Sequence, residues 1–143
     1  EHRQEFVAEV DGVSYVNDSK ATNADSTEEA LKRFNNIIWI LGGRPKEDGI
    51  ESLVRYFNKI CFALLIGEVA EEWSRLFIQR GVKNEIAKTL DVAVRRSAEI
   101  SKIYGGDAVL LSPSCASFDQ FKDFEDRGRQ FKDLVFKLKE KTK

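Results

Sequence analysis

The sequence predicts an α/β fold in which a mostly parallel sheet lies between layers of helices. Continuous apolar runs at 36–41, 60–66 and 108–111 are typical of strands buried on both faces of a parallel sheet. The stretches between these runs repeat apolar residues at helical spacing, which indicates amphipathic helices. Strands that alternate with helices form right-handed crossover units, so we expect a three-layer sandwich.

The chain opens with a predicted β-hairpin. Two β-rich runs at 6–10 and 13–16 flank Asp11 and Gly12, a dipeptide typical of a two-residue type I′ turn. This hairpin would add an antiparallel edge to the sheet. The second run leads into the polar loop 17–23, whose largest hydrophobic side chain is alanine. A loop that joins the carboxyl end of a strand to a helix is where α/β proteins place ligands.

The next elements alternate as an α/β fold requires. A capping-box pattern, Ser26 followed by Glu29, opens a predicted helix over 25–34. The buried run 36–41 ends in the polar loop 42–48. Further along the chain we expect a helix at 50–57, a strand at 60–66, a helix at 69–77 and a short strand at 84–89.

The C-terminal part of the chain is expected to complete the sheet and cover it. A helix over 90–101 precedes the strand 108–111 and the polar loop 112–120. A final helix from about 119 to 138 follows, and the charged tail 137–143 is expected to be solvated or frayed. The apolar stripe of the final helix consists of Phe121, Phe124, Phe131, Leu134, Val135 and Leu138.

Composition narrows the class of protein. The 143 residues suit one domain, with 42% hydrophobic and 33% charged residues and a net charge of −1. That balance argues against nucleic acid or an anionic membrane surface as the main partner. No apolar stretch is long enough to span a bilayer, no signal peptide is evident, and two cysteines do not make a disulfide framework. We therefore expect a cytoplasmic protein.

The N-terminus indicates a longer parent protein. The sequence contains no methionine and begins with Glu1, His2 and Arg3. A complete reading frame would start with methionine, so we expect a piece of a longer chain, or a chain that has lost an N-terminal segment by processing.

Three polar loops define a candidate binding site. Each leaves the carboxyl end of a predicted strand, and in a parallel sheet those ends share one rim. Lys20, Thr22, Lys46 and Ser117 are therefore expected to converge on a ligand. Lysine charges, hydroxyls and the free amides of a helix expected to begin near Ser117 suit an anion carrying carboxylates or phosphates.

The sequence lacks the motifs of a complete catalytic centre. It contains no Ser-His-Asp set, zinc-ligand spacing or phosphate-binding G-x-x-x-x-G-K-[ST] loop, and His2 is its one histidine. We expect no metal ligands in this chain. The pattern indicates a binding half-site.

Each candidate residue also has a purely structural interpretation. Ser117 can be an N-cap worth about 1 kcal/mol, and Phe124 lies on the core stripe of the final helix. Lys46 can be a solvated loop residue. Turn or cap roles suit Asp18 and Thr22, and His2 and Arg3 lie next to the chain end.

Three motifs together carry a family resemblance. The segments 17–23, 42–46 and 111–121, followed by Arg127 and Gly128, resemble the Mur ligases, and within that family the members that add D-glutamate. The resemblance covers essentially the whole chain. It implies that residues 1–143 are the C-terminal, Rossmann-like domain of a three-domain enzyme, whose N-terminal and central ATPase domains lie outside this chain.

The resemblance also implies an activity. Members use ATP to convert the carboxylate of UDP-N-acetylmuramoyl-L-alanine to an acyl phosphate, which the amine of D-glutamate then attacks during peptidoglycan biosynthesis. The phosphate loop and the Mg²⁺ ligands belong to the central domain, so the isolated chain is expected to be inactive.

Site roles follow from the matched motifs. The D-glutamate contacts are expected at Thr22, Lys46, Ser117, Phe118 and Phe124. The nucleotide side is expected at His2, Arg3, Asp18 and Lys20, with Lys20 also offsetting charge in the transition state. Other members often have leucine in place of Phe118, a change of little consequence if the contact is made by the backbone.

Two other functions remain open from the sequence. One is a stand-alone, non-catalytic module that binds an amino acid or a nucleotide. The other is the corresponding domain of a sister Mur ligase or of a polyglutamate-type ligase.

Overall fold

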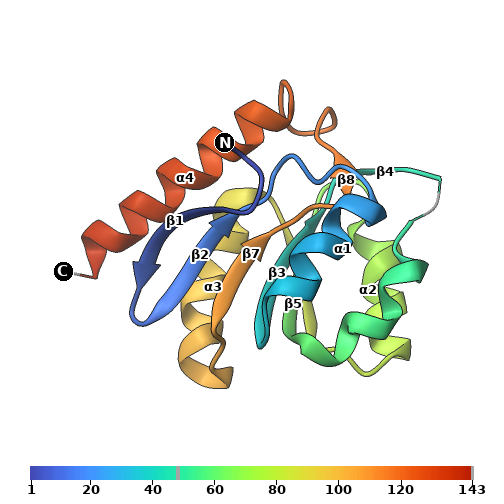
Figure 1. Ribbon diagram of the computed structural model, residues 1–143, viewed down its shortest axis with the longest axis horizontal. Helices are drawn as coiled ribbons and strands as arrows, with labels where there is room; N and C mark the ends of the chain where they lie inside the picture. The colour runs from blue at the N-terminus through green and yellow to red at the C-terminus, as the bar shows by residue number, and fades with distance from the viewer. Residues whose placement is uncertain (48, 143) are drawn as a thin grey trace.

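The computed structural model describes residues 1–47 and 49–142 and confirms the predicted three-layer α/β sandwich (Figure 1). A six-stranded sheet has the order β1-β2-β7-β3-β5-β6, and all neighbouring pairs except β1–β2 are parallel. The elements are β1 (Glu5–Val10), β2 (Val13–Asn17), α1 (Ala24–Arg33), β3 (Ile37–Gly42), β4 (Arg44–Pro45), the 3₁₀ helix η1 (Glu51–Lys59), β5 (Ile60–Ile66), α2 (Ala70–Gln79), β6 (Asn84–Lys88), α3 (Leu90–Tyr104), β7 (Ala108–Leu111), β8 (Cys115–Ala116) and α4 (Phe124–Lys141).

The N-terminal hairpin forms as predicted. β1 and β2 are antiparallel, and Val10 pairs with Val13 across the turn. Asp11 and Gly12 have φ values of 50° and 81°, and a type I′ turn requires positive φ at both central residues. The hairpin therefore forms the antiparallel edge of the sheet.

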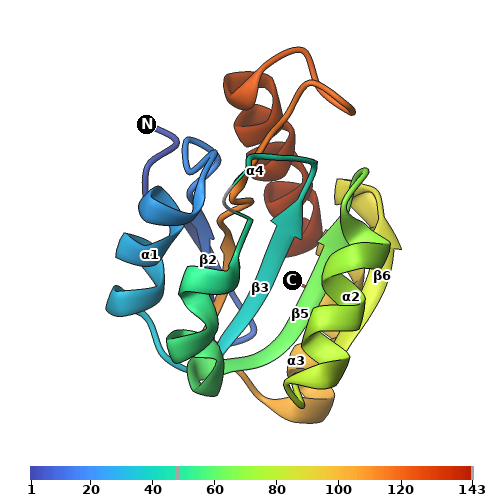
Figure 2. The same ribbon diagram turned by 90° about the vertical axis from the view of Figure 1, so that its right-hand side faces the viewer.

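Alternating residues of β3 supply the two halves of the core. Trp39 and Leu41 face the layer formed by α1, η1 and α2, whereas Ile38 and Ile40 face α3 and α4. Figure 2 shows these two helical layers on opposite faces of the sheet. Complete burial of side chains of this size contributes roughly 1.5–3 kcal/mol each, so this alternation accounts for much of the stability.

The segment before β5 is a 3₁₀ helix and not the α-helix that its apolar spacing suggests. It runs directly into Ile60, the first residue of β5. Its nine residues cover roughly 18 Å as a 3₁₀ helix, whereas an α-helix of the same length would cover roughly 14 Å.

The N-terminal caps of two helices differ from those predicted, although α1 starts within one residue of its predicted start. The N-cap of α1 is Asn23, whose Oδ1 accepts the N–H of Ser26 at 2.9 Å, so Ser26 does not open a capping box. The helix α4 begins at Phe124, five residues later than predicted, after the N-cap Asp123. Asparagine and aspartate are caps at least as strong as serine, which explains both shifts. At its other end α4 continues to Lys141, so residues 137–141 of the predicted tail are helical, and residue 143 lies outside the described residues.

None of the helices within residues 1–47 and 49–142 has the length and apolar character needed to cross a membrane.

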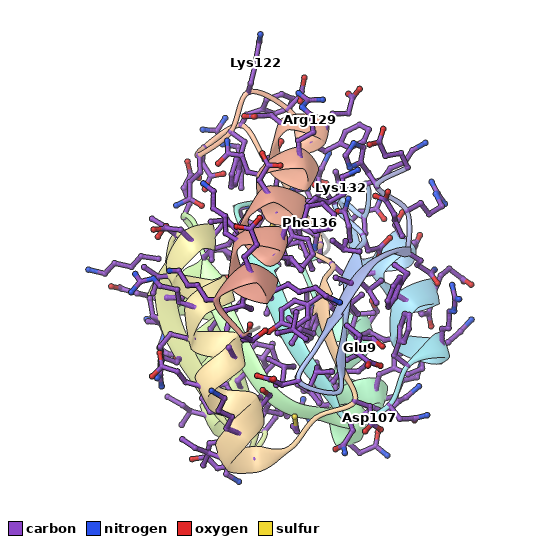
Figure 3. All side chains as sticks on the ribbon, turned by 90° about the vertical axis from the view of Figure 1, so that its left-hand side faces the viewer. Glu9, Asp107, Lys122, Arg129, Lys132 and Phe136 are labelled. Atoms are coloured by element: carbon purple, nitrogen blue, oxygen red, sulfur yellow. The ribbon has the colours of Figure 1, made fainter. Side chains whose placement is uncertain are left out.

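The helix α4 packs closely on the N-terminal segment. Lys132 donates from Nζ to Glu1 Oε2 at 2.6 Å and to Glu5 Oε2 at 3.3 Å, and Figure 3 shows Lys132 on α4. One turn earlier, a Cβ added to Gly128 would overlap the imidazole of His2. His2 is only 4% exposed, so its ring cannot yield without losing its contacts.

Gly128→Ala is therefore expected to destabilise the chain by about 1–3 kcal/mol through overpacking, although alanine favours a helix by about 1 kcal/mol. In the His2→Ala background the same substitution should be neutral or stabilising, because the overlap disappears. Urea unfolding of the four proteins measures this cycle. Equal destabilisation in both backgrounds would contradict the packing described for His2.

Candidate functional site

The three polar loops share one rim, as predicted. Asn17 at the end of β2 pairs with Leu111 at the end of β7, and Gly42 at the end of β3 pairs with Ile66 of β5. The backbone N–H of Asp18 donates to Leu111 O at 2.7 Å. This rim lies at the upper edge of the sheet in Figure 1, where β4 and β8 are labelled.

Two of the loops pair with each other. Arg44 opposes Ala116 and Pro45 opposes Cys115 in a short antiparallel ladder, β4–β8, which the sequence did not predict. A Cβ on Gly43, at φ 132°, would lie 2.6 Å from Ala116 O. This position therefore needs glycine, because only its backbone can approach β8 so closely.

Loop 17–23 joins this ladder through one hydrogen bond, in which Ser114 N donates to Ala21 O at 2.9 Å. Lys20 and Thr22 flank Ala21, and Ser114 precedes Cys115, the partner of Pro45. Lys46 follows Pro45, so the predicted candidates from two loops lie around the same ladder.

Both lysines at this ladder are available for an anion. Lys20 and Lys46 are exposed, and within residues 1–47 and 49–142 neither ammonium group forms an ion pair. Thr22 is half-buried. Within the part of the chain that the structure describes, the rim thus presents the charges of Lys20 and Lys46 beside a hydroxyl.

Ser117 does not begin a helix. Its carbonyl accepts the N–H groups of Gln120 at 3.1 Å and Phe121 at 2.8 Å, which closes a separate turn over 117–121. Ser117 is buried beneath this turn, whereas the ring of Phe118 is 64% exposed. The expectation of free helix amides at Ser117 was therefore wrong, and so was its interpretation as an N-cap.

Half of the polar loop 17–23 faces inward. Asn17 Nδ2 donates to Glu5 Oε1 at 2.9 Å and lies 2.9 Å from His2 Nδ1. The carboxylate of Asp18 accepts Ser112 Oγ at 2.7 Å. These side chains fasten the loop to the sheet and to the N-terminal segment.

Asp18 is a buried carboxylate with an altered affinity for protons. Its Oδ1 accepts the N–H of Gln4 at 3.1 Å, and the residue is 2% exposed. Burial raises the pKa of Asp18 to about 6, and the hydrogen bonds from Ser112 and Gln4 offset this only in part. No ion pair joins it to Arg3 in the part of the chain that the structure describes.

The expected nucleotide side divides into buried and exposed members. His2 and Asp18 are buried, whereas Arg3 and Lys20 are exposed. The backbone N–H of Lys20 donates to His2 O at 2.9 Å, so the four residues lie together at the end of the hairpin. Phe124 lies here too, with its ring edge-on to that of His2 at 6.2 Å between centroids.

Arg127 is the main residue that sequence reasoning missed. It is 0% exposed, yet no carboxylate pairs with it within residues 1–47 and 49–142. Nε donates to Ser19 Oγ at 2.9 Å, Nη2 to Ser19 O at 2.6 Å and Nη1 to Cys115 O at 3.1 Å. Burial lowers the pKa of Arg127 to about 10, so the side chain stays cationic at neutral pH. The sequence did contain a clue to this burial, since Arg127 lies between Phe124 and Phe131 on the apolar stripe of the final helix.

Cys115 is unsuited to nucleophilic chemistry. Its side chain is fully buried in β8, and burial raises the pKa of the thiol to about 12. The thiolate is therefore a negligible fraction at neutral pH.

Glu1, His2 and Glu5 bring ligand atoms within 4.8 Å of one another, a geometry that can hold a metal ion. However, the ammonium group of Lys132 already contacts both carboxylates. This ammonium group offsets one of the two negative charges and occupies carboxylate oxygens that a metal ion would need, so we assign no metal ligand to the cluster.

Comparison with known proteins gives consistent matches. A family model described as Mur ligase, glutamate ligase domain matches residues 2–115. Enzymes called UDP-N-acetylmuramoylalanine–D-glutamate ligase are similar over nearly the whole chain: that of Bradyrhizobium diazoefficiens is 52% identical over 94% of it, and that of Rhodospirillum rubrum is 46% identical over 96%. The chain spans about 29% of the length of each of these relatives.

One solved structure agrees in fold. A murein peptide ligase from Psychrobacter arcticus superposes with a TM-score of 0.62 and 13% identity, covering 96% of this chain and 29% of that one. At this identity the likeness concerns the fold alone.

The raised pKa of Asp18 predicts a measurable pH dependence. Because the folded-state value of about 6 exceeds the ordinary 3.8, the contribution of this carboxyl to stability is complete below about pH 4 and is lost as pH rises through 6. Relative to Asp18→Asn, the free energy of unfolding of the unsubstituted chain should fall by roughly 2 kcal/mol between pH 4 and pH 7. Urea unfolding across this range gives the difference curve, in which the other titrations cancel. A flat curve would refute the assignment.

Proposed function

The chain belongs to the Mur ligase family, and from that premise we propose that it is the C-terminal domain of the ligase that joins D-glutamate to UDP-N-acetylmuramoyl-L-alanine in peptidoglycan biosynthesis. The relatives named for this reaction are about half identical to the chain, and the chain matches about 29% of their length. In this proposal residues 1–143 form one domain of a cytoplasmic enzyme, and the remaining domains lie outside this chain.

The observation that carries the proposal is the meeting of loops 17–23, 42–48 and 112–120 at one rim. D-glutamate has two carboxylates, and a site for it needs separate cationic and hydroxyl groups at a fixed spacing. Lys46 supplies a charge at the ladder that pairs with no carboxylate among the described residues, and Thr22 supplies a hydroxyl on the adjacent loop. Because the side chain of Ser117 is buried, Ser117 would take part in binding only through the backbone of the turn over 117–121.

Phe118 and Phe124 would have different parts in this site. Phe118 presents an exposed ring beside the proposed ligand, so binding should cover apolar surface there. Phe124 lies against His2 and accepts the hydroxyl hydrogen of Ser19 at its carbonyl, at 2.6 Å. Its contribution to D-glutamate binding would therefore come through the shape of the rim.

The nucleotide side is proposed at the end of the hairpin. Arg3 and Lys20 are exposed and would reach phosphate or ribose oxygens, whereas the buried His2 and Asp18 would hold them in place. ATP, with Mg²⁺ held by residues outside this chain, would supply the phosphoryl group that activates the substrate carboxylate. Lys20 would stabilise the negative charge that builds up as the amine attacks.

This domain would act mainly by orientation. Holding an amine against an activated carboxyl replaces a bimolecular encounter, which is worth roughly 7–11 kcal/mol at the upper limit. The rim is suited to this because its loops are joined by hydrogen bonds before a ligand arrives.

The test uses the full-length protein and Lys46→Ala. The full-length protein should release phosphate when ATP, UDP-N-acetylmuramoyl-L-alanine and D-glutamate are all present. Lys46→Ala should raise KM for D-glutamate roughly 10- to 100-fold, the loss expected for a hydrogen bond to a charged group. The exposed Lys102 on α3 provides a matched control, and Lys102→Ala should leave KM unchanged.

Two further comparisons separate the alternatives. The 143-residue chain alone should release no phosphate from ATP. A preference of the full-length protein for L-glutamate or a diamino acid would indicate a sister ligase. No ligation with any amino acid would favour a non-catalytic binding module and would refute the proposal.

A further inference from the structure

We propose that Asp119 is a positioning residue that fixes the rim for D-glutamate without contacting it. This inference rests on the proposed function. Asp119 lies in the middle of the turn over 117–121, directly after Ser117 and Phe118. Its Oδ2 accepts the backbone N–H of Glu68 at 3.0 Å. A single side chain thus ties the turn to the segment that follows β5, 51 residues earlier in the chain.

Two glycines show how tightly this carboxylate is enclosed. A Cβ on Gly67 would lie 2.6 Å from Asp119 Oδ2 and 2.5 Å from the Cα of Gly43. The backbone of Gly67 is also in the left-handed conformation, at φ 74°. A Cβ on Gly43 would lie 3.5 Å from Asp119 Oδ1. The carboxylate is therefore packed against the backbone of both neighbouring loops, and neither loop has room for a side chain there.

The same contacts involve the loop that carries Lys46. Gly43 precedes the ladder strand β4, and its carbonyl accepts the N–H of Val69 at 3.2 Å. Asp119 consequently sits where the loops after β3, β5 and β7 meet. Displacing its carboxylate would release the turn holding Ser117 and loosen the base of the loop holding Lys46.

The position also tolerates the negative charge of a carboxylate. Glu68 and Val69 lead into the N-terminus of α2, where backbone N–H groups and the helix dipole favour a negative charge. The guanidinium of Arg44 is nearby and pairs with Glu68 at 3.1 Å. Two positive features therefore flank the carboxylate, one from each loop.

Asp119 acts on a ligand indirectly. Its Oδ1 is buried and has no hydrogen-bond partner among residues 1–47 and 49–142, and its more exposed Oδ2 is held by the backbone N–H of Glu68. The role we assign to it is to set the distance between the turn at Ser117 and the ladder at Lys46. An error in that distance should weaken D-glutamate binding and leave the nucleotide side, at the end of the hairpin, unchanged.

The experiment compares substitutions in the full-length enzyme. Asp119→Ala should raise KM for D-glutamate at least tenfold and change KM for ATP less than threefold. Asp119→Asn retains an oxygen that can accept from Glu68 N, so its KM for D-glutamate should stay within about threefold of the unsubstituted value. Asp119→Glu keeps the charge but has no room between Gly43 and Gly67, so it should behave like Asp119→Ala. If Asp119→Ala does not fold, the KM of Asp119→Glu for D-glutamate provides the test.

Asp123→Ala is the matched control. Asp123 is also a carboxylate in this loop and also accepts one backbone N–H, that of Asp126 at 2.7 Å, but it caps α4 and does not hold the turn. Its loss should lower the melting temperature without changing KM for D-glutamate. An equal rise in KM for Asp123→Ala and Asp119→Ala, or no rise for Asp119→Ala, would overturn the inference alone. No ligation of D-glutamate by the unsubstituted enzyme would overturn the proposed function and the inference with it.

Discussion

The buried guanidinium of Arg127 is the constraint on which the rim depends. A charge that is removed from water without a carboxylate partner is costly unless its donors are satisfied. Here three donors reach three neutral oxygens, two on Ser19 and one on Cys115. Ser19 also donates to the carbonyl of Phe124 at 2.6 Å. Loop 17–23, loop 112–120 and the first turns of α4 must therefore keep one arrangement to keep this cation satisfied.

The rim has two layers with different tasks. The inner layer consists of buried polar groups such as Asn17, Asp18 and Ser112, whose hydrogen bonds are made within the chain. The outer layer includes Lys20 and Lys46, whose charges are free in the described part of the structure. A binding site gains affinity when its groups are ordered before the ligand arrives, because less conformational entropy is lost on binding. The buried layer provides this order for the exposed one.

The sequence predicted the parts of the fold that depend on strong local patterns. The strands 60–66 and 108–111 were placed to the residue, because a parallel strand buried on both faces is a continuous apolar run. The shared rim was also predictable, since topology alone brings the carboxyl ends of parallel strands together. The β4–β8 ladder was not, because two residues that include Pro45 have no strand periodicity.

The differences in burial at the site have one physical cause, which is that a sequence does not reveal the direction in which a polar side chain points. Asp18 and Lys20 are equally polar in sequence, but one is buried and the other exposed. Arg127 was missed for the same reason: its place on the apolar stripe can be read from the sequence, but a charged residue is normally expected to point outward. Asp119 could not be singled out, because its partner Glu68 N is 51 residues away in the chain.

The most direct test of this account is amide hydrogen exchange in Arg127→Lys. Lysine keeps the positive charge but cannot donate to Ser19 and Cys115 in the fixed fork geometry of a guanidinium. The account predicts that the amide of Ser114, which bridges the two loops, exchanges at least tenfold faster, while the amide of Ala63 in β5 keeps its protection. Unchanged exchange at Ser114, or equal acceleration at both amides, would contradict the claim that Arg127 holds the loops in one rim.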